Sequence, residues 1–285
     1  MVKLVRFQFE DSSPRLGILL GTEVLDISSA GVTCLSQLLD GPSPASLLGA
    51  LSQQPLPRIA ATSARLLAPI ADQEVWAAGV TYLRSKKARM EESDFSASAY
   101  DRVYEAPRPE LFFKSLGSKV SGPGAKVGIR RDAKWNVPEP ELVLVYNSRG
   151  ALVGYTAGND MSSRDIEGEN LLYLPQAKTY RHSCALGPCL VLGVTEAQAR
   201  EWKIRISITR GGQEVFDGDT AVGQIKRTFA DLTDYLFRSQ EFPSGVYLFT
   251  GTGVIPPDAF TLAAEDVVRI TIGDIGTLEN EVVVV

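Results

Sequence analysis

The sequence has few cysteines and no long apolar run, and both shortages exclude whole classes of protein. The three cysteines cannot all pair with one another, and they do not form a metal-binding quartet. No apolar stretch approaches the roughly 18 residues that a membrane-spanning helix needs. We therefore expect neither a disulfide-stapled scaffold nor a membrane protein.

An excess of positive charge is also missing. The chain carries 29 lysines and arginines against 34 aspartates and glutamates, a formal net charge of −5, which argues against a nucleic-acid surface or a basic membrane face. The first residues alternate and then become acidic, so they predict a strand and not a secretion signal. Together with the scarce cysteines, this pattern favours a reducing, cytoplasmic location.

What is present is an ordinary globular composition over 285 residues, with 44% hydrophobic and 22% charged residues. That length is enough for about two domains. Short apolar runs separated by glycine and proline predict a mainly β or α+β body. We place a small N-terminal domain at residues 1–65 and the main domain at residues 66–285. The polar, helix-favouring residues 84–104 are predicted to form a lid between apolar strands.

Two glutamates precede a strongly apolar strand. Side chains in a strand alternate between faces, so Glu139 and Glu141 point the same way, and Val143 and Val145 continue that face. Pro140 donates no ladder hydrogen bond, which predicts a sheet edge or a bulge at this point. Two carboxylates on one face resist burial, so they need either solvent or a cation.

A third carboxylate, Asp160, follows the next predicted strand, after a hairpin turn at residues 147–150. Three oxygen donors without histidine or cysteine partners favour a hard cation, Mg²⁺ first, with Mn²⁺ and Ca²⁺ as alternatives. The same spacing also fits a solvated face for the two glutamates and a turn or helix-cap role for Asp160. The pattern alone leaves both interpretations open.

Separated sequence blocks give the chain a specific likeness. They read AAGVTY from residue 77, PEPELVLV from residue 138, GYTAGNDMSSRDIE from residue 154, LPQAKTYRHSCALGP from residue 174 and IGTLENEV near the end. In this order they resemble the fumarylacetoacetate hydrolase family. The resemblance implies a smaller N-terminal domain and a β-rich catalytic domain, of mixed β-sandwich or roll type, over residues 66–285.

The resemblance also implies a set of site residues. One divalent ion would be held by Glu139, Glu141 and Asp160, and Lys178 would face the substrate. Taken without the resemblance, Lys178 is a surface lysine. A divalent ion that chelates the carboxylate and keto oxygens of a 2-keto acid acidifies the neighbouring C–H bonds. Three carboxylates outweigh the charge of one such ion, which favours a nearby ammonium.

The chain departs from the hydrolases of this family, which activate water with a histidine. Ser85 occupies the histidine position, and the only histidine, His182, follows the lysine block. The segments VTYLRSKKARMEES and RPELFFKS resemble a narrower group, the dehydratases of 2-keto-3-deoxy sugar acids, in particular 2-keto-3-deoxy-D-pentonate. This resemblance implies an acid/base role for Glu110 opposite Lys178. The alternative for Glu110 is a surface carboxylate beside a strand.

Four further residues are candidates for binding the substrate. Arg84, Ser85 and Arg89 lie in the predicted lid, where arginine offers a planar pair of donors to a carboxylate. They fit equally well as charges on the surface of the lid. Thr252 lies in a block that matches the family segment lining the pocket floor, and its hydroxyl could bond the substrate carboxylate.

We therefore expect a Mg²⁺-dependent dehydratase of pentose oxidation that converts 2-keto-3-deoxy-D-pentonate to 2-oxoglutarate semialdehyde. Its partner would be a small 2-keto acid, with no nucleic acid and no membrane. The resemblance implies a homo-oligomer, a dimer or a tetramer. Two alternatives remain: a hydrolase or decarboxylase of an acylpyruvate or related 2-keto acid on the same metal site, and a catalytically silent metabolite-binding protein.

Overall fold

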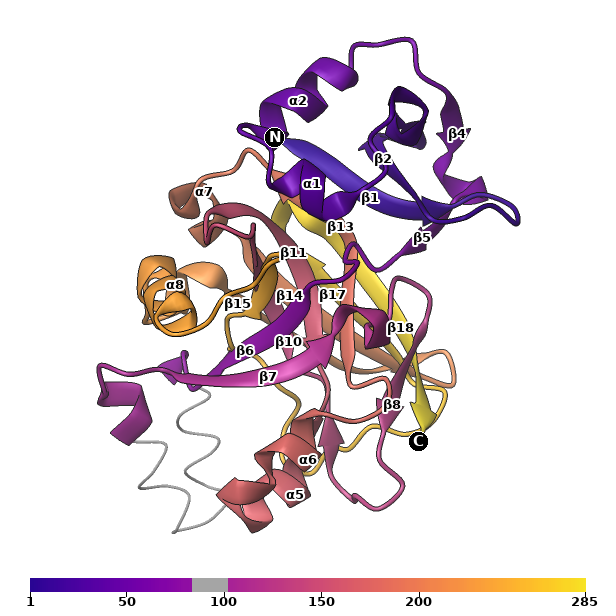
Figure 1. The fold of residues 1–285 in the computed structure, drawn as a ribbon. Helices are drawn as coiled ribbons and strands as arrows, with labels where there is room; N and C mark the ends of the chain where they lie inside the picture. Colours follow the sequence, from indigo (N-terminus) through magenta and orange to yellow (C-terminus); the bar gives the residue numbers. More distant parts are fainter. Residues whose placement is uncertain (84–101) are drawn as a thin grey trace.

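Strands dominate the computed structural model, which describes residues 1–83 and 102–285 (Figure 1). The largest sheet of the described part has eleven strands, ten of them in one continuous order. In that order they are β4 (Arg58–Ala60), β3 (Glu23–Asp26), β2 (Arg15–Leu20), β1 (Val2–Gln8), β13 (Cys184–Leu192), β11 (Leu152–Asp160), β10 (Pro140–Tyr146), β16 (Val246–Phe249), β6 (Glu74–Gly79) and β7 (Glu110–Leu116). The remaining strand, β5 (Arg65–Leu67), pairs with β1.

A second sheet and several short helices complete the described residues. The second sheet runs β15 (Gln213–Ala221), β14 (Lys203–Arg210), β17 (Val267–Ile272), β18 (Gly276–Val284) and β8 (Lys126–Ile129). A two-stranded ladder joins β12 (Ser162–Ser163) to β9 (Asn136–Val137). The α-helices of the described residues include α1 (Leu35–Leu39), α2 (Pro44–Leu51), α5 (Arg164–Glu169), α6 (Leu174–Lys178), α7 (Glu196–Arg200) and α8 (Phe229–Phe237), and residues 102–105 are also helical. None of the helices in these ranges is long and apolar enough to cross a membrane.

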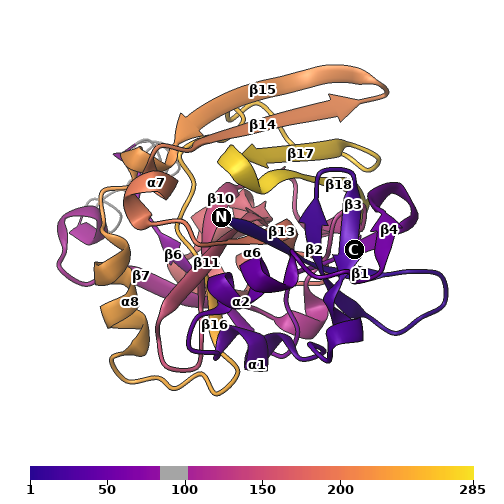
Figure 2. The same cartoon turned by 90° about the horizontal axis from the view of Figure 1, so that it is seen from above.

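The two larger sheets lie against each other, with β14, β15 and β17 along one side of the molecule (Figure 2). Leu142 and Leu144 of β10 share one buried cluster with Ile206 of the second sheet. The intervening Val143 and Val145 belong instead to the cluster that contains the apolar residues of α1 and α2. Strand β10 is therefore buried on both faces, which explains the unbroken apolar run of residues 142–145. The predicted β-rich, mixed fold is confirmed.

The hairpin predicted around residues 147–150 is also confirmed, because β10 and β11 pair antiparallel across that turn. The expectation of a sheet edge or a bulge at Pro140 is wrong. Strand β10 lies inside the sheet, and Pro140 is its first residue, beyond the last pair that β10 makes with β16 at Val143 and Phe249. Its missing N–H therefore costs no ladder bond on that side.

The N-terminal segment continues the large sheet. Strand β1 pairs with β2 on one side, and on the other side its first residues pair with β13 of the main body and its last residues with β5. Figure 1 shows this indigo segment, with α1 and α2, beside β13. The domain boundary at residues 65 and 66 remains a prediction. The lid predicted over residues 84–104 lies almost entirely outside the described residues.

Candidate active site

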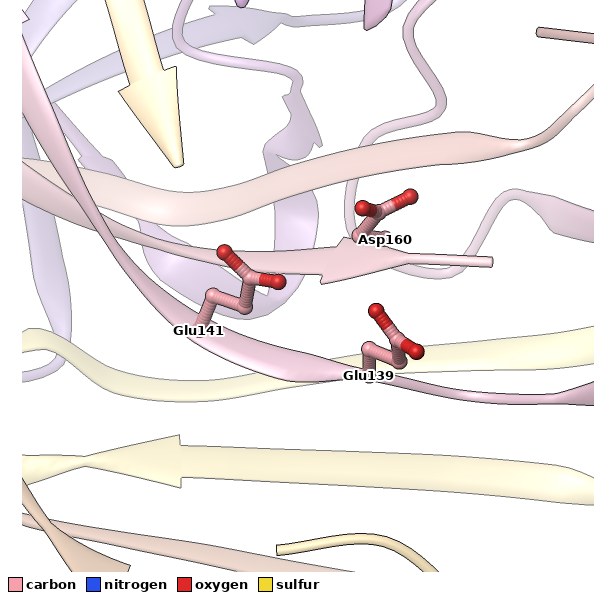
Figure 3. A group of neighbouring side chains, drawn as sticks. All are labelled: Glu139, Glu141 and Asp160. Carbon is pink, nitrogen blue, oxygen red and sulfur yellow. The ribbon is translucent and has the colours of Figure 1, made fainter. Parts of the chain in front are cut away.

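Three carboxylates meet at the end of the β10–β11 hairpin. Glu139, Glu141 and Asp160 each offer one oxygen, and these three oxygens all lie within 4.8 Å of one another. Figure 3 shows the two glutamates on one strand, pointing towards Asp160 on the neighbouring strand. All three residues are at most 2% exposed. The solvated-face interpretation of the glutamates is therefore wrong, and the cluster predicted from their alternation is present.

Strand register explains why these carboxylates face one another. Glu141 pairs with Gly158, and the Asp160 N–H donates to the Glu139 carbonyl at 2.9 Å. Glycine is required opposite Glu141, because a Cβ at position 158 would lie 2.3 Å from the ring of Phe249. The hairpin thus places its two strand ends side by side with all three acidic side chains on one face.

Lys178, at the end of α6, lies directly beside this cluster and is 1% exposed. Its Nζ lies 2.7 Å from Glu139 Oε2, 3.2 Å from Asp160 Oδ2 and 2.5 Å from Ser162 Oγ. It is also 6.0 Å from the centroid of the Phe112 ring. The lysine that the sequence singles out therefore contacts two of the three candidate metal ligands, and it is not a surface residue.

Two more groups hold the glutamates. Arg164, which is 2% exposed, donates to Glu139 Oε1 at 2.7 Å, and the Gly251 N–H donates to Glu141 Oε2 at 2.6 Å. Burial raises the pKa of Glu141 well above its usual value, and the charges of Asp160 and Glu139 raise it further, against a lowering by Lys178. More positive charge at this cluster would therefore stabilise ionised Glu141.

One pocket brings most of the predicted residues together. Its lining includes Glu139, Glu141, Asp160, Lys178 and Thr252. Thr252 is buried, and its hydroxyl donates to the Val254 carbonyl at 3.0 Å.

Glu110 lines a second hollow with Glu167, and its carboxylate lies against Gly79, which lines the first pocket. A Cβ at position 79 would lie 1.9 Å from Glu110 Oε2, so only glycine admits this carboxylate without displacing it. The role of Glu110 opposite Lys178 remains a prediction.

The remaining predicted residues are not among the described residues that line this pocket. Arg84, Ser85 and Arg89 lie outside the described residues. His182 lines a different hollow, with its Nδ1 3.4 Å from Ser121 Oγ. Two buried cations beside the cluster, Arg164 and Lys114, were not predicted from the sequence. The Nζ of Lys114 lies 2.5 Å from Asp160 Oδ1. An arginine inside a family block and a lysine inside an apolar strand were the signals available.

Comparison with known proteins agrees with this geometry. Residues 74–283 match the family model described as fumarylacetoacetate hydrolase, C-terminal. A protein of Haloferax volcanii named probable 2-keto-3-deoxyxylonate dehydratase is 45% identical over 217 residues, which cover 76% of this chain and 74% of that protein. The 2-dehydro-3-deoxy-D-arabinonate dehydratase of Saccharolobus solfataricus is 38% identical over 217 residues, covering 75% of this chain and 73% of that protein.

Solved structures resemble the whole described fold. A structure of 2-keto-3-deoxy-D-arabinonate dehydratase, complexed with magnesium and 2,5-dioxopentanoate, superposes with a TM-score of 0.84 at 30% identity and covers 99% of both chains. The sequence blocks, the arrangement of strands and the family match thus point the same way. The chain belongs to the fumarylacetoacetate hydrolase family.

Proposed function

We propose that this protein is a magnesium-dependent dehydratase that converts a 2-keto-3-deoxy-pentonate to 2,5-dioxopentanoate, which is 2-oxoglutarate semialdehyde. The observation that carries the proposal is the buried cluster of Glu139, Glu141 and Asp160 with Lys178 beside it. Two relatives that are 45% and 38% identical carry the names of dehydratases of this substrate class. A structural neighbour at 30% identity holds magnesium and that product.

The donor set suits magnesium. Three buried carboxylate oxygens without nitrogen or sulfur donors are typical of a hard cation. We assign Glu139, Glu141 and Asp160 as its ligands. When bound there, the ion would draw electron density from the keto oxygen of the substrate and so make the C3 hydrogens more acidic.

Lys178 and Glu110 are the proposed acid/base pair. One removes a proton from C3, and the other assists the departure of the C4 hydroxyl, so that one water is released. Movement of a proton from C5 and tautomerisation then turn the C5 alcohol into an aldehyde. C4 is reduced as C5 is oxidised, so the reaction needs no external oxidant.

Binding of the substrate would use further groups. We assign Thr252 to the substrate carboxylate, since it lines the pocket with the proposed ligands; its hydroxyl would turn from the Val254 carbonyl to donate to the carboxylate. Arg84, Ser85 and Arg89 are proposed to contact the carboxylate and hydroxyls from the segment that follows Tyr82. We also propose a homo-oligomer, a dimer or a tetramer, that acts in the cytoplasm.

One comparison of substrates tests the function. The protein should be incubated with 2-keto-3-deoxy-D-pentonate and, separately, with an acylpyruvate, each with Mg²⁺ and with excess chelator. We expect the sugar acid to lose the mass of one water only when Mg²⁺ is present, and the acylpyruvate to stay intact. Cleavage or decarboxylation of the acylpyruvate, with the sugar acid unchanged, would replace the dehydratase by a hydrolase or decarboxylase. If neither substrate is converted, the protein would instead be a metabolite-binding protein without catalytic activity.

A further inference from the structure

Lys114 is a buried lysine that the proposed reaction does not yet use. It lies on β7, and its side chain is 0% exposed, which places it among the largest fully buried side chains of the described residues. A buried ammonium is costly unless charged or polar partners surround it. Its position therefore calls for an explanation in terms of what it contacts.

A local irregularity of β7 turns this lysine inwards. Val75 of β6 pairs with Ser115, while the next residue, Trp76, pairs with Phe113. Lys114 is therefore an extra residue on β7, with no residue opposite it, as in a β-bulge. Bulges of this kind redirect a side chain, and here both Lys114 and Ser115 are buried in succession.

The Lys114 ammonium has three oxygen neighbours, one in an ion pair and two that accept its hydrogen bonds. Its Nζ lies 2.5 Å from Asp160 Oδ1 and 3.1 Å from the Met161 carbonyl, and it also donates to the carbonyl of Lys178. These partners belong to two separate elements, the end of β11 and the end of α6. The Lys114 side chain thus contacts both the proposed metal ligand Asp160 and the backbone of the proposed acid/base residue Lys178.

We infer that Lys114 is a positioning residue that fixes both groups at once. By occupying Asp160 Oδ1, it leaves the other oxygen, Oδ2, on the side of Lys178 and Glu139. By holding the Lys178 carbonyl, it fixes the point from which the Lys178 side chain extends. This inference rests on the proposed metal site, and it adds a residue that touches neither the ion nor the substrate.

The affinity for Mn²⁺ tests whether Lys114 orients Asp160. In Lys114→Met we expect Mn²⁺ to bind about 10- to 100-fold more weakly, as is typical when an outer residue that orients a ligand is lost. At saturating Mn²⁺, kcat should still be reduced while KM changes little, because Lys178 has lost its backbone anchor. Lys119→Met is the matched control, since Lys119 is an exposed lysine shortly after β7, and it should bind Mn²⁺ like the unmodified protein.

A double-mutant cycle separates positioning from charge. Free Mn²⁺, read by electron paramagnetic resonance, would be compared for Lys114→Met, Asp160→Asn and the double variant. If Lys114 acts through Asp160, its loss should add little once Asp160 is changed. Equal weakening in both backgrounds would overturn the inference. So would tighter Mn²⁺ binding in Lys114→Met, because removal of a repelling charge alone would give that result.

Two further measurements keep the test decisive. If Lys114→Met fails to fold, as judged by its melting transition, Lys114→Gln takes its place, because the glutamine amide can still donate to one of the three oxygens. An intermediate Mn²⁺ affinity in this variant supports positioning, and an unchanged affinity contradicts it. Unmodified protein that binds no Mn²⁺ would instead contradict the proposed metal site itself.

Discussion

Replacing Lys178 by methionine should lower turnover by about 100- to 10,000-fold, the range typical for loss of an acid/base group. Methionine keeps the length and the apolar stem of the side chain but removes the ammonium that lies 2.7 Å from Glu139 Oε2. Mn²⁺ should still bind, because the three carboxylates remain. Steady-state rates with the sugar acid, combined with a Mn²⁺ titration, check both halves of this expectation.

A matched control excludes a general effect of removing a lysine. Lys203 of β14 is exposed, and Lys203→Met should keep the turnover of the unmodified protein. Loss of one partner of a buried ion pair destabilises a fold by about 3–5 kcal/mol, so the melting transition of Lys178→Met must be recorded as well. Folded Lys178→Met with unchanged turnover would remove Lys178 from the reaction.

The second large effect concerns the proposed ligands. Asp160→Asn should weaken Mg²⁺ and Mn²⁺ binding by at least about 100-fold, more than the loss of an outer residue costs, because the amide carries no negative charge. Activity should then require far higher Mg²⁺ concentrations. Calorimetric titration with Mn²⁺ measures the affinity directly.

Glu139→Gln should behave in the same way as Asp160→Asn, since both side chains belong to one cluster. Asp258→Asn changes an exposed aspartate outside the pocket and serves as the control. Ion binding that is unchanged in both cluster variants would show that the metal, if it binds, is held elsewhere.

Local patterns predicted the centre of this site. The alternation of Glu139 and Glu141 and the hairpin turn after β10 depend only on neighbouring residues, and the structure contains both. The hairpin then carries Asp160 back to the same end of the sheet. The family resemblance added Lys178, whose helix follows β11, β12 and α5 along the chain and whose ammonium contacts Glu139.

Features that depend on distant pairing could not be predicted. Whether Pro140 lies at an edge is decided by β16, a strand more than 100 residues later in the chain. The burial of Lys114 depends on a register shift between β6 and β7, so a lysine within an apolar strand did not by itself show that its side chain is buried. Arg164 lies in a polar stretch, and only the folded position of Glu139 shows why it is buried.

The central claim is that Glu139, Glu141 and Asp160 bind one divalent cation, which in turn coordinates a 2-keto acid. It is tested most directly by anomalous diffraction from crystals grown with Mn²⁺ and pyruvate, a 2-keto acid without a C4 hydroxyl to lose. We expect one strong peak bonded to oxygens of Glu139, Glu141 and Asp160, with the carboxylate and keto oxygens of pyruvate completing its coordination. A peak away from these residues, or pyruvate bound without contact to the ion, would contradict the account.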